Sequence, residues 1–455
     1  MRNKTGVPEL KSASYVEGPG ANAIDLVLIV VAVKMMGFPG TLSPYFGQFE
    51  TILNSVIYPG MFLVVVAVII NKGRHVLLGK IAFPQMTIVG FLFCIFLSGC
   101  FGAFAGKVTA VNALKLSIIA SFALVVVYSL EWTKIIKDLF IAVAFVVAVN
   151  FCVMLIPGIG FRNYQANGAS FTGLWSTKNN CAGLMAFSIV FTSLCITGKT
   201  ETFCVGKRTG LQIVLLALLL LLEAVMLIAS NGIGGIACVI ASLLFVFFGD
   251  RIVLTKNLGV AYIALYIAFA LVVFYLTPAI APYLSQLDRS TDLTGRTDIW
   301  QGIARIVRER NILFGLGYDG DFWSEGTEAF SAIQSVYLSL GMHTINNGGH
   351  NAFMEILLQS GVVGLASFLL MMVTVFSGFD LIRESSISNW VLAFFVFFSV
   401  YGLTESLMAY SSWTTLFLFV ACGFIVRYGH IDDSSKTKDR DFCSYSTQTT
   451  WLEGA

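Results

Sequence analysis

Long apolar segments recur along the whole chain, and their length limits the fold more than any other feature of the sequence. A helix needs about 20 apolar residues to cross the hydrocarbon core of a bilayer, which is about 30 Å thick. Charged residues make up only 12% of this chain, whereas soluble domains average about 25%. We therefore expect an all-α, polytopic membrane protein with about 12 transmembrane helices. The apolar segments are 22–38, 51–70, 81–103, 111–130, 139–156, 179–197, 211–229, 231–248, 258–277, 352–377, 389–407 and 411–427.

Lysine and arginine residues are unevenly divided between the two sets of connecting loops. If the N-terminus lies in the cytoplasm, the short outer loops hold only Lys107, Arg162 and Lys178. Cytoplasmic loops of membrane proteins are enriched in these residues, so the pattern predicts that both termini are cytoplasmic. The cytoplasmic set is Lys72, Arg74, Lys80, Lys134, Lys137, Lys199, Lys207, Arg208, Arg251, Lys256 and Arg383.

One connection between spans is much longer than the others. The predicted order is a cytoplasmic tail (1–21), nine spans (22–277), a large outer loop (278–351), three spans (352–427) and a second cytoplasmic tail (428–455). Within the outer loop, Ile299, Ile303 and Ile306 recur at the spacing of one helix face, and polar residues take the opposite face. We therefore expect the large loop to contain an amphipathic helix.

The cysteines and the charge pattern exclude several functional classes. Most of the nine cysteines lie inside apolar segments, and neither a Cys-x-x-Cys pair nor a Cys/His cluster occurs. The sequence therefore predicts no metal site and no disulfide framework. It also lacks a basic stretch interleaved with aromatic residues, so we expect no nucleic-acid partner.

His350 and Asn351 lie at the boundary between the outer loop and the span that follows it. A neutral imidazole can take a proton from an attacking hydroxyl near neutral pH. At this boundary it would meet water-soluble groups at the depth of lipid headgroups, and the preceding glycines, Gly348 and Gly349, allow a bulky ligand to approach the backbone. The alternative is a histidine that caps the next helix or hydrogen-bonds a carbonyl.

Three basic residues on the outer side are candidates for binding an anion. Arg296 precedes the amphipathic helix, and its planar guanidinium matches phosphate oxygens. Lys178 and Asn179 open a helix after the outer loop that contains Arg162, and basic side chains at a helix N-terminus form an anion site. The alternatives are an Arg296 paired with a neighbouring aspartate and a Lys178 that extends to lipid headgroups above an asparagine cap.

Two carboxylates, Glu223 and Glu405, fall within apolar segments. Ionisable groups inside a membrane are costly and therefore indicate function by default. Glu405 is near the outer end of its span, where it can contact substrate at headgroup depth. Glu223 is deeper, and a structural pairing with a lysine such as Lys115 is an equally good interpretation.

Three motifs together resemble the O-antigen ligase and Wzy-type polysaccharide polymerase superfamily of bacterial envelope enzymes. They are STKNNCAG (176–183), GRTDIW with its amphipathic helix and GLGYDG (295–320), and GGHNAFMEILLQSGVVGL (348–365). The resemblance covers roughly residues 170–410. It implies a metal-independent, inverting glycosyltransferase of GT-C-like type that needs no cofactor, because a pyrophosphate donor is already activated.

The resemblance also implies the substrates and a role for each matched residue. An oligosaccharide on undecaprenyl pyrophosphate would pass to an acceptor hydroxyl at the periplasmic face of the bacterial inner membrane. Arg296 would hold the pyrophosphate, and His350 would deprotonate or orient the hydroxyl. Asn351 would hold a sugar ring or begin the helix, and Lys178 with Arg162 would add positive charge.

The sequence departs from the family pattern at residues 230–232, Ser-Asn-Gly, where many relatives carry an arginine. Together with the STKN stretch, this departure favours a polymerase of O-antigen, capsule or exopolysaccharide, and a chain-length regulator is then a candidate partner. The first alternative is a ligase that transfers glycan to lipid A core or another acceptor. A transporter of polysaccharide or lipid-linked sugar and a sensory or scaffold protein are the alternatives from other classes.

Overall fold

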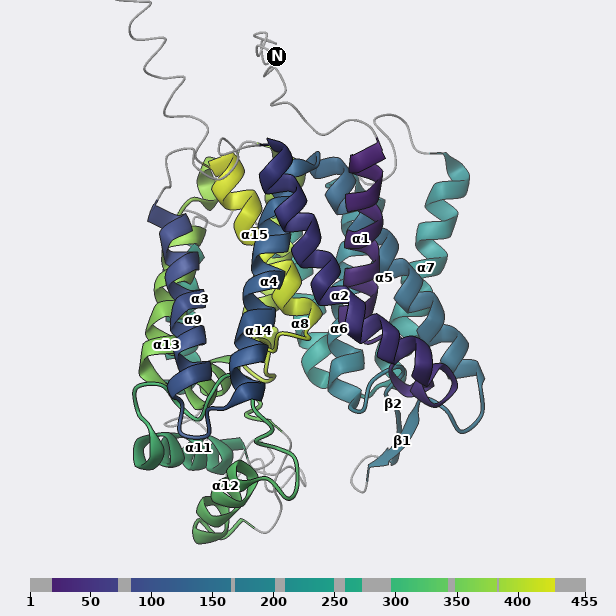
Figure 1. Ribbon diagram of the computed structural model, residues 1–455. Coiled ribbons are helices and arrows are strands. Elements are labelled where there is room, and N and C mark those ends of the chain that lie inside the picture. The colour runs from purple at the N-terminus through teal and green to yellow at the C-terminus, as the bar shows by residue number, and fades with distance from the viewer. Residues whose placement is uncertain are drawn as a thin grey trace, which may run out of the picture.

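The computed structural model describes residues 19–72, 83–164, 168–200, 209–248, 258–271, 296–342, 348–382 and 384–429. Most of both predicted tails and residues 278–295 and 343–347 of the predicted outer loop lie outside the described residues. The described residues form fourteen α-helices and one two-stranded hairpin, which confirms the all-α prediction. Figure 1 shows the long helices side by side in one bundle, with α11 (Arg296–Arg310) and α12 (Glu328–Ser339) beyond one of its ends.

Each of the twelve predicted spans contains one helix of the bundle, and eight of the described helices are long and apolar enough to cross a membrane. The prediction of a multi-pass membrane protein is therefore confirmed. The eight are α2 (Ser43–Lys72), α3 (Phe83–Phe101), α4 (Lys107–Ser129), α5 (Trp132–Leu155), α6 (Lys178–Thr197), α7 (Gly210–Ala229), α13 (Ala352–Phe376) and α14 (Ser385–Gly402). The shorter four are α1 (Pro19–Met35), α8 (Ile233–Phe248), α9 (Leu258–Leu271) and α15 (Trp413–Gly429). Two 3-10 turns, η1 (Gly40–Leu42) and η5 (Phe379–Leu381), adjoin α2 and α13.

The helices pack in pairs that are distant in sequence. α13 packs along α3, α14 along α8 and α15 along α4, while α6 contacts both α7 and α8. At the centre, the ring of Phe187 on α6 lies 5.7 Å from that of Phe394, 5.4 Å from that of Phe397 and 5.4 Å from that of Trp413. Such aromatic pairs add about 0.5–1.5 kcal/mol each beyond their buried area. They fix α6, α14 and α15 relative to one another.

We call the end of the bundle that carries α11 and α12 the α11 end. The hairpin of β1 (Phe161–Tyr164) and β2 (Gly168–Phe171) lies at the same end, and Arg162 pairs with Ser170 across it. The start of α1 and the end of α15 lie at the opposite end (Figure 1). Both described ends of the chain therefore share one side of the bundle, and the described part of the large loop is on the other.

The predicted amphipathic helix of the large loop is α11. Its apolar residues Ile299, Ile303 and Ile306 are buried, and they pack with α12 and with Leu358 of α13. The apolar face is thus covered by protein, which fixes the N-terminus of α11 relative to the N-terminal half of α13.

The loop after α11 docks onto a break in α13. At Gly361 the backbone has φ +62° and ψ −165°, a conformation that only glycine adopts readily. Val362 N donates to Ile312 O at 2.9 Å, and a Cβ on Gly361 would lie 2.4 Å from Leu313 O. The glycines of this region therefore allow two backbone segments to touch, and the contact holds α11 in place.

Candidate active site

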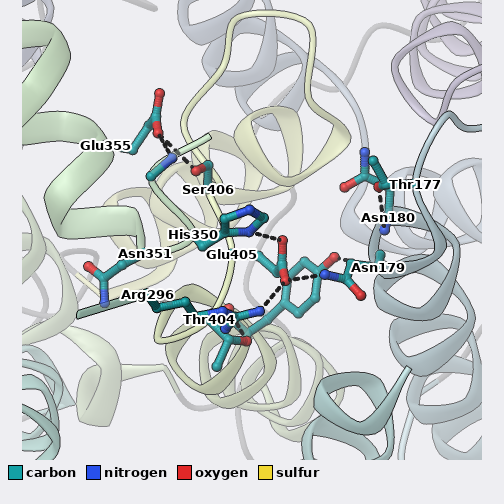
Figure 2. Close-up of polar contacts among 12 residues, drawn as sticks. Thr177, Asn179, Asn180, Arg296, His350, Asn351, Glu355, Thr404, Glu405 and Ser406 are labelled. Carbon is teal, nitrogen blue, oxygen red and sulfur yellow. Dashed lines mark hydrogen bonds and ion pairs between the residues drawn. The ribbon is translucent and has the colours of Figure 1, made fainter. Parts of the chain in front are cut away.

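Four polar side chains from separate parts of the chain meet at the α11 end of the bundle (Figure 2). Arg296 is the first residue of α11, and Asn179 lies in the first turn of α6. His350 lies just before α13, and Glu405 follows α14. The fold thus brings together residues that the sequence could select only one by one.

The Glu405 carboxylate is the common partner in this cluster. Asn179 Nδ2 donates to Oε1 at 2.7 Å, Arg296 Nη2 donates to the same oxygen at 3.4 Å, and His350 Nδ1 lies 3.5 Å from Oε2. Only 9% of Glu405 is exposed. A buried carboxylate is stable only where it has charged or hydrogen-bonding partners, and here it has three. Among the described residues Arg296 pairs with Glu405 and not with Asp298, while Asp292, the other aspartate of that alternative, lies outside the described residues.

The contact through Nδ1 determines which role the His350 imidazole can take. If Nδ1 carries the proton and faces the carboxylate, Nε2 is the nitrogen that can accept a second proton. The 3.5 Å separation is long for a hydrogen bond, but catalytic contacts of this kind often shorten when substrate binds. The backbone of His350 has φ +46°, a sparsely populated region for residues other than glycine. Such strain clusters at functional sites.

The loop that carries His350 is held through the backbone of Gly349. Gly349 N donates to Glu355 Oε2 at 2.7 Å, and Trp300 Nε1 donates to Gly349 O at 2.9 Å. Ser406 Oγ donates to the same Glu355 oxygen at 3.0 Å. A Cβ on Gly349 would lie 2.7 Å from that oxygen, so a larger residue would displace the Glu355 carboxylate from its present position. These contacts tie α11, α13 and the loop after α14 to the position of His350.

Asn351 is the N-cap of α13. Its side-chain oxygen accepts from Phe353 N at 2.9 Å and from Met354 N at 3.1 Å, while its Nδ2 donates to Leu403 O at 3.1 Å. Of the two roles that the resemblance implies for Asn351, this geometry matches the start of a helix. The Leu403 contact also joins that start to the segment that carries Glu405.

Three helices begin in this region: α6 at Lys178, α11 at Arg296 and α13 at Ala352. Each helix N-terminus carries roughly half a positive charge, and such ends bind phosphates and other anions. The cap of α6 is Thr177, which accepts from Asn180 N at 3.4 Å. An asparagine cap was the alternative here; with Thr177 in that role, the Asn179 amide reaches Glu405 instead.

The remaining predicted residues differ in their distance from the cluster. Lys178 is the first residue of α6 and is partly exposed, next to Asn179. Arg162 is exposed on β1, and no hydrogen bond or ion pair joins it to the cluster within the described part of the chain. Both therefore lie at the α11 end of the bundle, where the cluster is. Only Lys178 is next in sequence to a residue of the cluster, Asn179.

Glu223 does not join the cluster. It is fully buried on α7, where Ser188 and Thr192 of α6 donate to its Oε1, the latter at 2.8 Å. The suggested partner Lys115 instead donates to Asn112 Oδ1 at 3.2 Å. The position of Glu223 thus connects α7 to α6 inside the bundle.

Two residues of the site were not predicted from the sequence, Glu355 and Tyr401. Glu355 supports Gly349, and the rule that selected Glu223 and Glu405 applies to it as well, because it is a carboxylate in the first turn of an apolar span. Tyr401 is buried, and its hydroxyl donates to Asn179 O at 2.8 Å. Nothing distinguishes Tyr401 in the sequence from the other aromatic residues of its span.

The cluster combines a base, a guanidinium and helix N-termini, and it is therefore suited to hold an anion and to move a proton. Within the described residues, no group of three or more His, Cys, Asp or Glu side chains is arranged to hold a metal ion.

Comparison with known proteins finds a similar family for part of the chain. Residues 215–369 match the family model described as O-antigen ligase. The matched region runs from α7 into α13 and includes Arg296, His350 and Asn351, whereas Asn179 and Glu405 lie outside it. A search of curated proteins finds no match. The match over residues 215–369 supports the similarity of this chain to the O-antigen ligase and Wzy-type polymerase superfamily.

Proposed function

We propose that this protein is a polymerase that joins lipid-linked repeat units of an O-antigen, capsule or exopolysaccharide. It transfers an oligosaccharide from undecaprenyl pyrophosphate to a hydroxyl of an acceptor repeat unit, at the periplasmic face of the bacterial inner membrane. The observation that carries this proposal is the convergence of Arg296 and His350 on Glu405 beside three helix N-termini.

Arg296 is suited to hold the pyrophosphate of the donor. Its side chain remains 19% exposed, and Nη2 alone contacts Glu405, so other N–H groups of the guanidinium can bind phosphate oxygens in pairs. The nearby helix N-termini add positive charge. Together they stabilise the negative charge that develops on the leaving group as the glycosidic bond to phosphate breaks.

His350 supplies the base. The acceptor oxygen attacks the anomeric carbon of the donor while Nε2 takes the hydroxyl proton. The bond between that carbon and the phosphate oxygen breaks, and undecaprenyl pyrophosphate leaves with the electron pair. Attack from the opposite face inverts the anomeric configuration, and Glu405 stabilises the imidazolium that results. Because Arg296 and the helix ends provide the positive charge, we expect the rate to be unaffected by a metal chelator.

The family description favours a second candidate function, a ligase that transfers finished glycan to lipid A core or another acceptor. The two functions use the same groups and differ only in the acceptor. Purified protein in lipid, given lipid-linked repeat units alone, distinguishes them. A polymerase produces a ladder of longer lipid-linked products, whereas a ligase produces no extension until a second acceptor is added.

Two variants test the assignment of the reacting groups in the same assay. Arg296→Lys keeps the charge but loses the planar guanidinium that can bind two phosphate oxygens at once. His350→Asn removes the imidazole but places there a residue that tolerates positive φ. We expect each to lower the transfer rate by roughly 10²- to 10⁴-fold. Arg308→Lys, an exposed position on α11, is the matched control. Normal products from both site variants at normal protein levels would overturn the proposal.

A further inference from the structure

A cavity of about 560 Å³ lies beside the Glu405 cluster. Its lining includes residues of α1, α2 and α4 together with residues 406–407 and 409–414. Tyr401 and Ser406 belong both to its lining and to the surroundings of the cluster, because Tyr401 donates to Asn179 O and Ser406 donates to Glu355 (Figure 2). The cavity and the cluster therefore share a wall.

Aromatic rings and hydroxyl groups make up much of the lining. Tyr58 and Tyr410 face each other with ring centroids 6.0 Å apart at 61°, and Trp175 and Trp413 also contribute. Aromatic faces pack against the C–H faces of sugar rings, while hydroxyl and amide groups bond to sugar hydroxyls. The volume is within the range of roughly 300–1,000 Å³ that is typical of ligand sites. This lining is suited to a short stretch of oligosaccharide.

The charge of the lining is positive. It includes Lys34 and Lys115, and no aspartate or glutamate belongs to the described lining. Lys34 is neutralised by Glu50, whose Oε1 lies 3.2 Å from the ammonium. Lys115 therefore remains as the main source of charge in the cavity.

The ammonium of Lys115 is held mainly by aromatic rings and an amide, and the Asp319 carboxyl is near enough to interact with it electrostatically. Its Nζ lies 4.5 Å from the ring centroid of Tyr410 and 5.4 Å from that of Tyr58, and it donates to Asn112 Oδ1 at 3.2 Å. Among the described residues it takes part in no ion pair. Aromatic faces stabilise a cation without forming an ion pair with it, so Lys115 remains available to an anionic ligand.

We propose that this cavity is the acceptor subsite and that Lys115 selects a repeat unit bearing an acidic group. The acidic group is a carboxylate or a phosphate carried on a sugar, and the sugar rings lie between the tyrosines and tryptophans. This inference rests on the proposed function, because an acceptor held here would present its hydroxyl past Ser406 toward His350. Lys115 is a specificity-determining residue and takes no part in the bond-breaking step.

The first test is the composition of the polysaccharide that depends on this gene. Deleting the gene should abolish a polymer, and the repeat unit of that polymer should contain a uronic acid, a pyruvate ketal or a phosphate. Loss of a wholly neutral polymer would overturn the acidic subsite and leave the proposed function intact. Unchanged polysaccharide of every kind would overturn the proposed function itself.

The second test compares Lys115→Gln with Lys107→Gln, an exposed lysine at the start of the same helix. Initial rates are measured against acceptor concentration with the full-length protein in lipid. We expect Lys115→Gln to raise KM for the acceptor by about tenfold or more with kcat nearly unchanged, Lys115→Arg to restore the low KM, and Lys107→Gln to have no effect. Equal KM values for Lys115→Gln and Lys107→Gln would overturn the assignment.

A change in the acceptor provides the same test without a change in the protein. Reducing the carboxylates of a uronic-acid acceptor to alcohols removes the charge and keeps the sugar rings. With the unsubstituted protein, we expect KM to rise by about tenfold or more, as it does for Lys115→Gln with the native acceptor. An acceptor whose only acid is a phosphate is treated with phosphatase instead. If KM does not change after the charge is removed, Lys115 does not recognise the acidic group of the acceptor.

Discussion

Glu405 contacts the two proposed reacting groups through different oxygens. Oε1 accepts from Arg296 and Asn179, whereas Oε2 faces His350. Arg296 can therefore turn toward a pyrophosphate without releasing His350, and Asn179 keeps Oε1 in place while it does so. At the residue scale, the site therefore depends on Glu405 contacting Arg296 through one oxygen and His350 through the other.

Glu405→Gln tests that division. Its amide oxygen would stay with the donors Arg296 and Asn179, and its NH₂ group would then donate to His350 Nδ1. The histidine proton would move to Nε2, which could no longer act as a base. We expect kcat to fall by roughly 10²- to 10⁴-fold, with KM for the donor changed little because Arg296 retains its position. A kcat equal to that of the unsubstituted protein would exclude Glu405 as the group that orients His350.

Single residues could be selected from the sequence where their type was unusual for their place. A histidine at the edge of an apolar segment and an arginine at the start of an amphipathic helix were sufficient to indicate a site. Their partners were not predictable, since Glu405 lies far along the chain from both Asn179 and Arg296. Glu223 satisfied the same rule of an acid inside an apolar segment, and the structure places it away from the cluster.

At the element scale, the break in α13 positions the site. The loop after α11 bonds to the backbone at Gly361, so α11 and α13 cannot move independently. The helices themselves follow from the length of the apolar segments and from the 3.6-residue period of α11. The break does not follow from either, because it exists only where a distant segment supplies the missing hydrogen bonds.

Gly361→Ala tests the importance of that break. The added methyl would lie 2.4 Å from Leu313 O. The backbone conformation at this position is also one that alanine rarely adopts. We expect a loss of about 3 kcal/mol in the free energy of unfolding and a lower transfer rate, because Arg296 moves with α11. Gly90→Ala in α3, where a Cβ meets nothing within 4 Å, should be neutral or slightly stabilising. Equal melting temperatures in detergent for the two variants would contradict this prediction.

At the scale of the whole molecule, the sequence predicted the all-α, multi-pass architecture and a helix in each of the twelve apolar segments, but not α12. It did not predict which helices pack together, such as α14 with α8 or α13 with α3. Lipid tails are as apolar as leucine, so a helix face that contacts protein differs little in hydropathy from one that contacts lipid. The pairing depends instead on shape, for example the rings around Phe187.

The proposed orientation can be checked by labelling from outside the cell. Ser324→Cys lies between α11 and α12, and Glu131→Cys lies at the opposite end of the bundle, near the Lys134–Asp25 ion pair; both positions are exposed. In cells with a permeabilised outer membrane, we expect a membrane-impermeant maleimide to label Ser324→Cys and to leave Glu131→Cys at the level of the unsubstituted chain. The reverse pattern would place the candidate active site in the cytoplasm.

The stability of the whole molecule should depend on pH through Asp319, in the loop between α11 and α12. Burial, with a contribution from Glu355, raises the pKa of this carboxyl from 3.8 to about 7. The folded state therefore binds the proton more tightly than the unfolded state, and the stability that this provides is lost as pH rises from about 4 through about 7. Asp319→Asn keeps a neutral side chain and a residue that tolerates the φ of +46°.

We expect Asp319→Asn to raise the melting temperature by several degrees at pH 8 and by much less at pH 5. Melting curves of the full-length protein in detergent at the two pH values are the measurement. A shift of the same size at both values would mean that packing, and not ionisation, controls the effect of this residue.

Because Glu405 lies after α14, the cluster at the α11 end is incomplete until the chain has been synthesised beyond α14. A nascent chain that has threaded Arg296 and His350 into the bilayer still lacks the carboxylate that orients them. We therefore expect a product truncated before Glu405 to lack the proposed transfer activity.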